Sequence, residues 1–528
     1  MDHLVTRALA ATAGGLGSEY LWLPVIGGFA MFYMAWGIGA NDVANAFATS
    51  WGAKSLTLKQ IVIVATICEF CGALLLGSHV SSTIRKGIVD IDAFPGDDGR
   101  LEIMTGMLSA LLAGGTWLLI ATKYSLPVST THTIVGSVIG MVIVGRGYDA
   151  VVWSKVVKIV LSWFISPLLA MGISGTVWAC TKYTVFAKDI DEAESVKRAK
   201  VAIPFLTFLT FTICVMFMIY KGGPALKLKS MSVASAIGWG ALVGGVFLFV
   251  SVFLLQKLIP QWEAQAEAEV ASRSEEGQQV TAKDTDVNTD ATVPVKQHEV
   301  AGQLAVQEPK KASDVGEPEV AKTAITTATV TEKETIGQGK DWDETIRSAD
   351  EPTTANGMLL EKMFRPLNIL TAAFESFAHG ANDVANAIGP FNAIVAAYNA
   401  PLASKVDMPL WILSVGGIGI VVGLWMYGTN VMKTMGKNIT YLSPARAFCI
   451  ELGATFTILL ATNMGMPVST THASVGAVLG IGCVDNIKKV KWGVMGSVFA
   501  SWIVTLPVAA LTTSAFYGFL KPTVVNMS

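Results

Sequence analysis

Charged residues are scarce in this chain. Of its 528 residues, 15% are Asp, Glu, Lys or Arg, whereas a typical soluble protein carries about a quarter. The formal net charge is −2, so the sequence provides no overall basic field that would attract nucleic acid or small anions. A binding site for an anion would therefore have to be built locally, from a few residues.

Several patterns that identify other functions are also missing. The sequence has no Walker loop, which argues against an ATP-driven pump, and no HExxH motif. It has six cysteines; Cys68 and Cys71 form a CxxC pair, but no second pair of zinc ligands follows at matching spacing. The N-terminus lacks an apolar core long enough for a secretory signal, so we expect residues 1–19 to be a short tail.

Apolar residues dominate instead, at 52% of the chain with a mean hydropathy of +0.52. Crossing a bilayer takes about 20 apolar residues per helix. The sequence therefore predicts an all-α polytopic membrane protein with about twelve transmembrane segments. The predicted segments are 20–48, 60–77, 103–122, 126–145, 155–181, 203–220, 231–256, 364–397, 409–428, 446–463, 466–484 and 491–519.

A hydrophilic segment separates two membrane halves, 20–256 and 358–528. Residues 257–357 are rich in Glu, Asp, Thr, Ala, Lys and Gln and poor in aromatic residues, so they cannot bury enough apolar surface to offset the entropy of ordering. We expect a disordered acidic loop, and a regulatory docking segment with unknown partners is the alternative. The Lys and Arg residues at 182–200 favour a cytosolic position for their loop, and hence for this segment.

Two motifs occur twice in the same order. GANDVANA at 39–46 returns at 380–387, and PVSTTH at 127–132 returns at 467–472. This pattern predicts two homologous membrane repeats, about 20–145 and 364–485. If each of the first seven segments crosses once, the second repeat enters from the opposite side and the repeats are inverted, as in many secondary transporters. Broken or re-entrant PVSTTH helices would change that count.

The GANDVANA motifs predict cation sites. Residues three or four apart share a helix face, so oxygen atoms of Asn41, Asp42 and Asn45 can converge, and such oxygen ligands suit Na⁺ or H⁺. Gly37 and Gly39 would permit local unwinding that frees backbone carbonyls. A structural Asn/Asp network between helices is the alternative. The predicted cation-binding residues, with sodium as the metal ion, are Asn41, Asp42, Asn45, Asn382, Asp383 and Asn386.

The PVSTTH motifs predict anion sites. Pro127 suits a first helical turn, and Ser129 or Thr130 can cap the free backbone N–H groups of that turn. These N–H groups and the positive end of the helix dipole favour binding of an anion without any Arg. An ordinary capped helix start is the alternative. Two such starts could hold one tetrahedral oxyanion, which gives the predicted phosphate-binding residues Ser129, Thr130, Thr131, Ser469, Thr470 and Thr471.

Other ionisable residues lie in apolar segments, where an Asp costs about 2.5 to 3.5 kcal/mol at a helix centre. Glu69 and Glu451 have no matching acid in the other repeat, so each is either a coupling or gating group or a hydrogen-bonding group between helices. For His132 and His472, the alternatives are a ligand or proton relay and a hydrogen bond that fixes the helix start. The roles of Glu375 and His379 stay open.

The paired GANDVANA and PVSTTH motifs, with GSHVSSTIRKGI at 77–88, resemble the PiT family of inorganic phosphate transporters across both membrane halves. The resemblance implies symport of phosphate with Na⁺, or with H⁺ in some members. It also implies a homodimer with a cytosolic loop, and it matches Glu69 and Glu451 to acids important in the family. Met107 departs from the pattern, because some animal relatives have an acid there.

We therefore expect a secondary active symporter, not an enzyme, that moves phosphate down a sodium gradient across the plasma membrane. It needs no cofactor besides co-transported Na⁺ (alternatively H⁺), contacts membrane lipids and binds no nucleic acid. Proton-coupled phosphate transport and sulfate transport are same-class alternatives. A phosphate-sensing receptor, or an intramembrane hydrolase that uses Ser129 and His132, would belong to different classes.

Overall fold

The computed structural model describes residues 15–223, 229–286, 352–402, 408–428, 431–432 and 442–525. These residues are helical or irregular, apart from one isolated β-bridge between Val89 and Val151. Among them, nine helices are long and apolar enough to cross a membrane: α2, α3, α5, α7, α8, α9, α11 with η5, α13 and α15. The predicted all-α membrane class is confirmed, but the count of twelve segments is not.

The first membrane half contains seven long helices and one short one. They are α2 (Trp22–Gly52), α3 (Leu58–Leu76), α4 (Ser78–Lys86), α5 (Gly96–Lys123), α6 (Thr130–Arg146), α7 (Trp153–Thr184), α8 (Glu192–Tyr220) and α9 (Val233–Asp286). Short helical turns are η1 (Ser18–Tyr20), η2 (Ile91–Ala93) and η3 (Tyr148–Ala150).

The second half begins with the long helix α10 (Ala355–Asn399). It continues with α11 (Leu410–Gly423), the π-helical turn η5 (Leu424–Gly428), α13 (Pro444–Asn463), α14 (Thr470–Asn486), η6 (Ile487–Lys489) and α15 (Trp492–Val525). The described parts of 1–268 and 352–528 form one compact unit, and the described residues 269–286 belong to a second unit. Helix α9 continues past residue 257, where we expected the hydrophilic loop to begin, and residues 287–351 lie outside the described residues.

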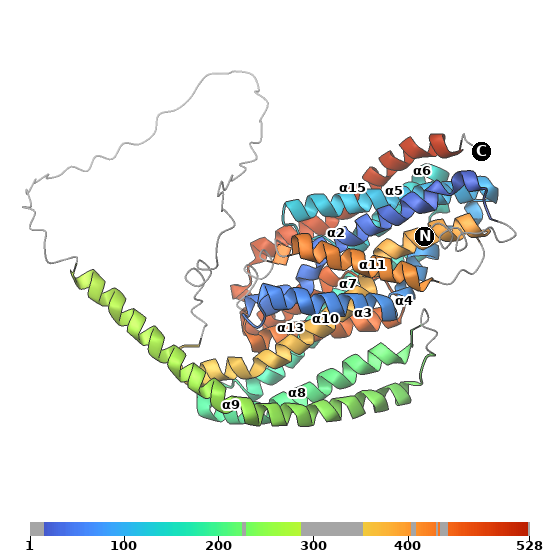
Figure 1. The fold of residues 1–528 in the computed structure, drawn as a ribbon. Coiled ribbons are helices and arrows are strands. Elements are labelled where there is room, and N and C mark those ends of the chain that lie inside the picture. Colours follow the sequence, from blue (N-terminus) through green and yellow to red (C-terminus); the bar gives the residue numbers. More distant parts are fainter. Residues whose placement is uncertain are drawn as a thin grey trace, which may run out of the picture. The chain divides into compact units, whose positions relative to one another are not determined.

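The helices of the two repeats pair in corresponding ways. Helix α2 packs on α11 as α10 packs on α3, and α2 packs on α5 as α10 packs on α13; α2, α5 and α15 can be followed in Figure 1. The last helices are exchanged, because α7 packs on α14 and α15 packs on α6. Each PVSTTH helix therefore lies against a helix of the other membrane half, although α7 and α15 follow the predicted repeats, 20–145 and 364–485. The inverted orientation of the repeats stays a prediction.

Small residues permit the exchanged helices to approach closely. A Cβ at Gly140 of α6 would lie 2.3 Å from the carbonyl oxygen of Ala510, and one at Gly480 of α14 would lie 2.3 Å from that of Met171. Gly136 and Gly476 precede these glycines by four residues and also face backbone carbonyls. Both contacts thus use a GxxxG pattern, which brings helix backbones together where the hydrophobic effect offers little driving force.

Equivalent ion clusters tie the ends of these helices. Glu102 lies 2.8 Å from Arg146 and 3.3 Å from Lys521. In the other repeat, one acid again faces two bases, since Asp485 lies 2.8 Å from both Arg446 and Lys182. Each cluster joins the last helix of one repeat to the PVSTTH helix of the other. The glycine contacts and the ion clusters at the helix ends therefore both stabilise the packing of α7 on α14 and of α15 on α6.

The two motifs fall in different local structures. Both GANDVANA motifs lie inside continuous helices, α2 and α10, so the unwinding expected around Gly37 and Gly39 does not occur. Both PVSTTH motifs lie at a break. Helix α5 ends at Lys123 before α6 begins, and α13 ends at Asn463 before α14 begins. The prediction of broken helices is correct for PVSTTH only.

Candidate functional site

The two PVSTTH helix starts face each other in the interior. Ser129 caps α6 by accepting a hydrogen bond from the backbone N–H of His132, and Ser469 caps α14 in the same way. The hydroxyl of Thr131 donates to the carbonyl oxygen of Val468 over 2.9 Å, and Thr471 donates to that of Val128 over 3.2 Å. The structure therefore brings the two predicted phosphate-binding sets together.

The first Asn of each GANDVANA motif holds the loop of its own repeat. Asn41 donates to the Thr122 hydroxyl and to the Leu126 carbonyl, and its Oδ1 accepts from the backbone N–H of Val128. The side-chain amide of Asn382 lies 3.1 Å from the Thr462 hydroxyl, which is the equivalent contact. For these two residues, the structural role is directly visible.

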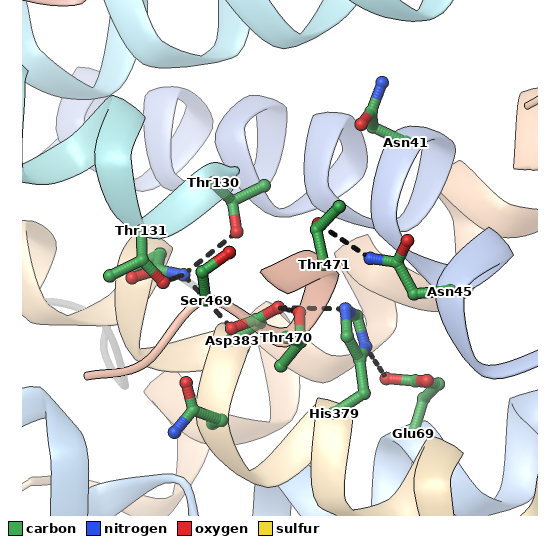
Figure 2. A network of polar contacts seen from close by, with 12 residues as sticks. Asn41, Asn45, Glu69, Thr130, Thr131, His379, Asp383, Ser469, Thr470 and Thr471 are labelled. Carbon is green, nitrogen blue, oxygen red and sulfur yellow. Dashed lines mark hydrogen bonds and ion pairs between the residues drawn. The ribbon is translucent and has the colours of Figure 1, made fainter. Parts of the chain in front are cut away.

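The second Asn of each motif reaches the other repeat. Asn45 donates to the hydroxyl of Thr471 over 2.8 Å (Figure 2). Asn386 donates to that of Thr130 over 3.1 Å. In both residues Oδ1 has no hydrogen-bond partner among the described residues. These carbonyl oxygens can therefore serve as cation ligands, while the amide nitrogens orient the threonines.

The two aspartates differ in their surroundings, although both are buried. Asp383 accepts a hydrogen bond of 2.7 Å from Thr470 and lies 3.0 Å from Nε2 of His379. In Asp42, neither carboxylate oxygen has a hydrogen-bond partner of ordinary geometry among the described residues. One ligand atom each from Asp42, His379 and Asp383 lie within 4.8 Å of one another. A cation there would offset the repulsion between two buried carboxylates.

Glu69 and His379 extend this cluster across the repeats. Nδ1 of His379 lies 2.8 Å from Oε2 of Glu69 (Figure 2). Ser376 donates to the other oxygen of Glu69. Each nitrogen of His379 thus faces a carboxylate oxygen. Only an imidazolium carries two N–H donors, so His379 can donate to both acids only when it is charged. It then acts as a fixed positive charge between Glu69 and Asp383.

Glu451 joins the two GANDVANA helices by hydrogen bonds. Its carboxylate accepts from Thr49 and Ser50 of α2 and from Asn368 and Thr371 of α10, at 2.6 to 2.7 Å. A carboxylate in the interior is tolerated when its oxygens are paired in this way. Glu69 and Glu451 therefore both connect the repeats, and neither contacts the phosphate-binding set directly in the described contacts.

Comparisons with known proteins show which family this chain belongs to. A family model described as the phosphate transporter family matches residues 38–513. The chain belongs to this family. It is 34% identical to the chloroplastic inorganic phosphate transporter 2-1 of Arabidopsis thaliana, over 93% of this chain and 70% of the relative. It is 27% identical to sodium-dependent phosphate transporter 1 of Mus musculus, over 98% of each chain.

A solved structure is also similar. It is titled "The sodium-dependent phosphate transporter", has a TM-score of 0.70 and 32% identity, and covers 94% of this chain and 99% of its own. The family and these relatives are transporters. The chain is therefore an integral membrane phosphate transporter and not an enzyme, which excludes the hydrolase alternative.

Sequence reasoning missed a polar stripe in this transporter. Asn368, Thr371 and Glu375 precede His379 on one face of α10 and recur every three or four residues. All are buried, and Glu375 accepts a hydrogen bond of 2.6 Å from Ser474. The same periodicity that identified the motifs could have identified the stripe. It shows that α10, unlike α2, is polar along its buried face well before the motif begins.

Proposed function

We propose that this transporter is a secondary active symporter that moves inorganic phosphate, driven by a sodium gradient across the plasma membrane. The observation that carries the proposal is the buried Asp42 carboxylate, which has no hydrogen-bond partner of ordinary geometry among the described residues and lies beside two polar helix starts. A buried charge needs a compensating partner. A transported cation provides one, and the names of the sodium-dependent relatives favour Na⁺.

Phosphate suits the other part of the site. The first turns of α6 and α14 combine free N–H groups, the positive ends of two helix dipoles and the hydroxyls of the PVSTTH motifs. Bound cations near Asp42 and Asp383 would reduce the repulsion between these carboxylates and an entering phosphate. Binding of cation and phosphate is then coupled, because each ion lowers the electrostatic cost of the other.

The contacts indicate which residues hold the cations and which hold phosphate. Asp42, Asp383 and the free Oδ1 atoms of Asn45 and Asn386 hold the cations, and the two Ser-Thr-Thr sets hold phosphate. Asn41 and Asn382 hold the PVSTTH loops in place. Glu69 and Glu451 connect the repeats, so that closing one side of the site is accompanied by opening of the other. We further propose a homodimer, with residues 257–357 in the cytosol.

Radiolabelled phosphate uptake into proteoliposomes tests this function. An inward Na⁺ gradient should raise the initial rate, and an imposed pH gradient without Na⁺ should not. Uptake that follows the pH gradient instead would establish proton coupling. Uptake that ignores both gradients would contradict symport. Competition by sulfate and arsenate separates the substrates, and binding of phosphate without any uptake would favour a sensor.

A further inference from the structure

Four aromatic rings form a continuous chain across the two repeats. The ring centroids of Trp163 and His132 lie 3.7 Å apart, those of His132 and His472 lie 4.5 Å apart, and those of His472 and Trp502 lie 3.6 Å apart. The rings come from α7, α6, α14 and α15 in that order, and all four are buried. The histidine pair in the middle is the point where the repeats meet.

The two histidines belong to the first turns that carry the predicted phosphate-binding groups. The backbone N–H of His132 donates to Ser129, and that of His472 donates to Ser469. A shift of either imidazole therefore shifts the first turn of its helix, together with the N–H groups and hydroxyls there. The ring chain thus connects the two helix starts directly, through His132 and His472.

The outer members of the chain also contact the opposite repeat. The hydroxyl of Ser162, next to Trp163, lies 3.5 Å from the carbonyl oxygen of Pro467, and that of Ser501, next to Trp502, lies 3.3 Å from that of Pro127. Each hydroxyl also makes a shorter bond within its own helix. In addition, Nδ1 of His472 lies 3.1 Å from the carbonyl oxygen of Trp163. The Ser-Trp pairs recur at nearly the same spacing as the PVSTTH motifs, so each exchanged helix contacts both helix starts.

Packing, more than hydrogen bonding, holds the rings together. One ring nitrogen in each of the four residues has no hydrogen-bond partner among the described residues. Aromatic pairs in contact are stabilised beyond the burial of their area. A phenyl ring in place of an indole should therefore preserve most of the contact, whereas an aliphatic side chain should not.

We propose that Trp163, His132, His472 and Trp502 are positioning residues that keep the two helix starts in register, so that a disturbance at one start reaches the other. That these starts bind phosphate rests on the proposed function. That the rings keep the two helix starts in register does not depend on the proposed function. The rings thus determine the separation of the two halves of the anion site without contacting the anion.

Hydrogen exchange measured by mass spectrometry tests the register without any substrate. Trp163→Leu should accelerate exchange in peptides covering 127–133 and also in those covering 467–473, by about 2- to 10-fold, the range expected from losing one aromatic contact. Trp163→Phe should stay near the wild type. Trp239→Leu, on the exposed face of α9, is the matched control.

A change confined to residues 127–133 would overturn the proposal, and so would equal effects of Trp163→Phe and Trp163→Leu. If Trp163→Leu does not fold, His132→Gln replaces it, with the same expectation for both peptides.

Phosphate uptake provides the second readout. Trp163→Leu should raise KM by about 2- to 10-fold and leave the maximal rate nearly unchanged, because positioning affects binding at both starts. His132→Gln and His472→Gln should be no worse together than singly, since each breaks the same chain. If the double variant raises KM by the product of the two single effects, the proposal is overturned. If the wild type takes up no phosphate while the exchange results hold, the proposed function fails and the ring chain stands.

Discussion

Asp42 and Asp383 occupy corresponding positions in the two GANDVANA motifs, yet within the described residues only the Asp383 carboxylate has partners at ordinary hydrogen-bond or ion-pair geometry. His379 provides the difference, because the residue four positions before Asp42 is the apolar Ile38. Helix α10 thus carries an imidazole one turn before its aspartate, while α2 carries none before Asp42. The two predicted cation sites are therefore not equivalent, and their variants should behave differently.

The first prediction concerns Asp42. Asp42→Asn removes the unpaired carboxylate with little change of shape, so we expect stimulation of phosphate uptake by Na⁺ to disappear. The measurement is initial uptake into proteoliposomes at several Na⁺ concentrations. Asp149→Asn, at an exposed position, is the control. Ordinary sodium dependence in the Asp42 variant would show that the cation binds elsewhere.

A second prediction concerns the pair Glu69 and His379. Removing one partner of a buried, hydrogen-bonded charge pair costs about 3–5 kcal/mol, so His379→Ala should lower the melting temperature of the purified protein. The double variant Glu69→Ala/His379→Ala should be destabilised by less than the sum of the single variants. Additive losses in the double-mutant cycle would mean that the two side chains do not interact.

The third prediction concerns Thr471, which accepts from Asn45 and donates to the Val128 carbonyl. Thr471→Val keeps the shape but removes both hydrogen bonds. Each is worth about 0.5–1.5 kcal/mol, so we expect the KM for phosphate to rise by about tenfold. Thr176→Val, at an exposed position of α7, is the control. An unchanged KM would place the anion away from this hydroxyl.

The fourth prediction concerns the glycine contact of α14 with α7. Gly480→Leu would place a side chain against the Met171 carbonyl, where a Cβ already comes within 2.3 Å. We expect loss of folded protein, because neither backbone can move without breaking its helix. Gly172→Leu, on α7, meets nothing within 4 Å and should be tolerated. Size-exclusion profiles in detergent compare the two, and a normal profile for Gly480→Leu would refute a close contact.

Residue types and their spacing are sufficient to predict the class of protein and the residues of the candidate site. Long apolar runs dictate membrane helices, because backbone polar groups in lipid must be paired within the segment. The repeated GANDVANA and PVSTTH motifs identify two matched sets of polar residues. Pro127 and Pro467 lie at the helix breaks, but two residues before the capping serines and not in the first helical turn, as we expected for Pro127. These features are local, so residue type and spacing are sufficient to predict them.

Which of these groups lie in contact could not be predicted without the fold. That Asn45 reaches Thr471, or that Glu451 holds both α2 and α10, depends on contacts between residues hundreds of positions apart. The helical periodicity of the sequence cannot predict contacts between such distant residues. The exchange of α7 and α15 between the repeats likewise follows from close backbone packing at glycines. The sequence shows that Ile38 precedes Asp42 by four residues and that His379 precedes Asp383 by four. That His379 also contacts Glu69 depends on the fold.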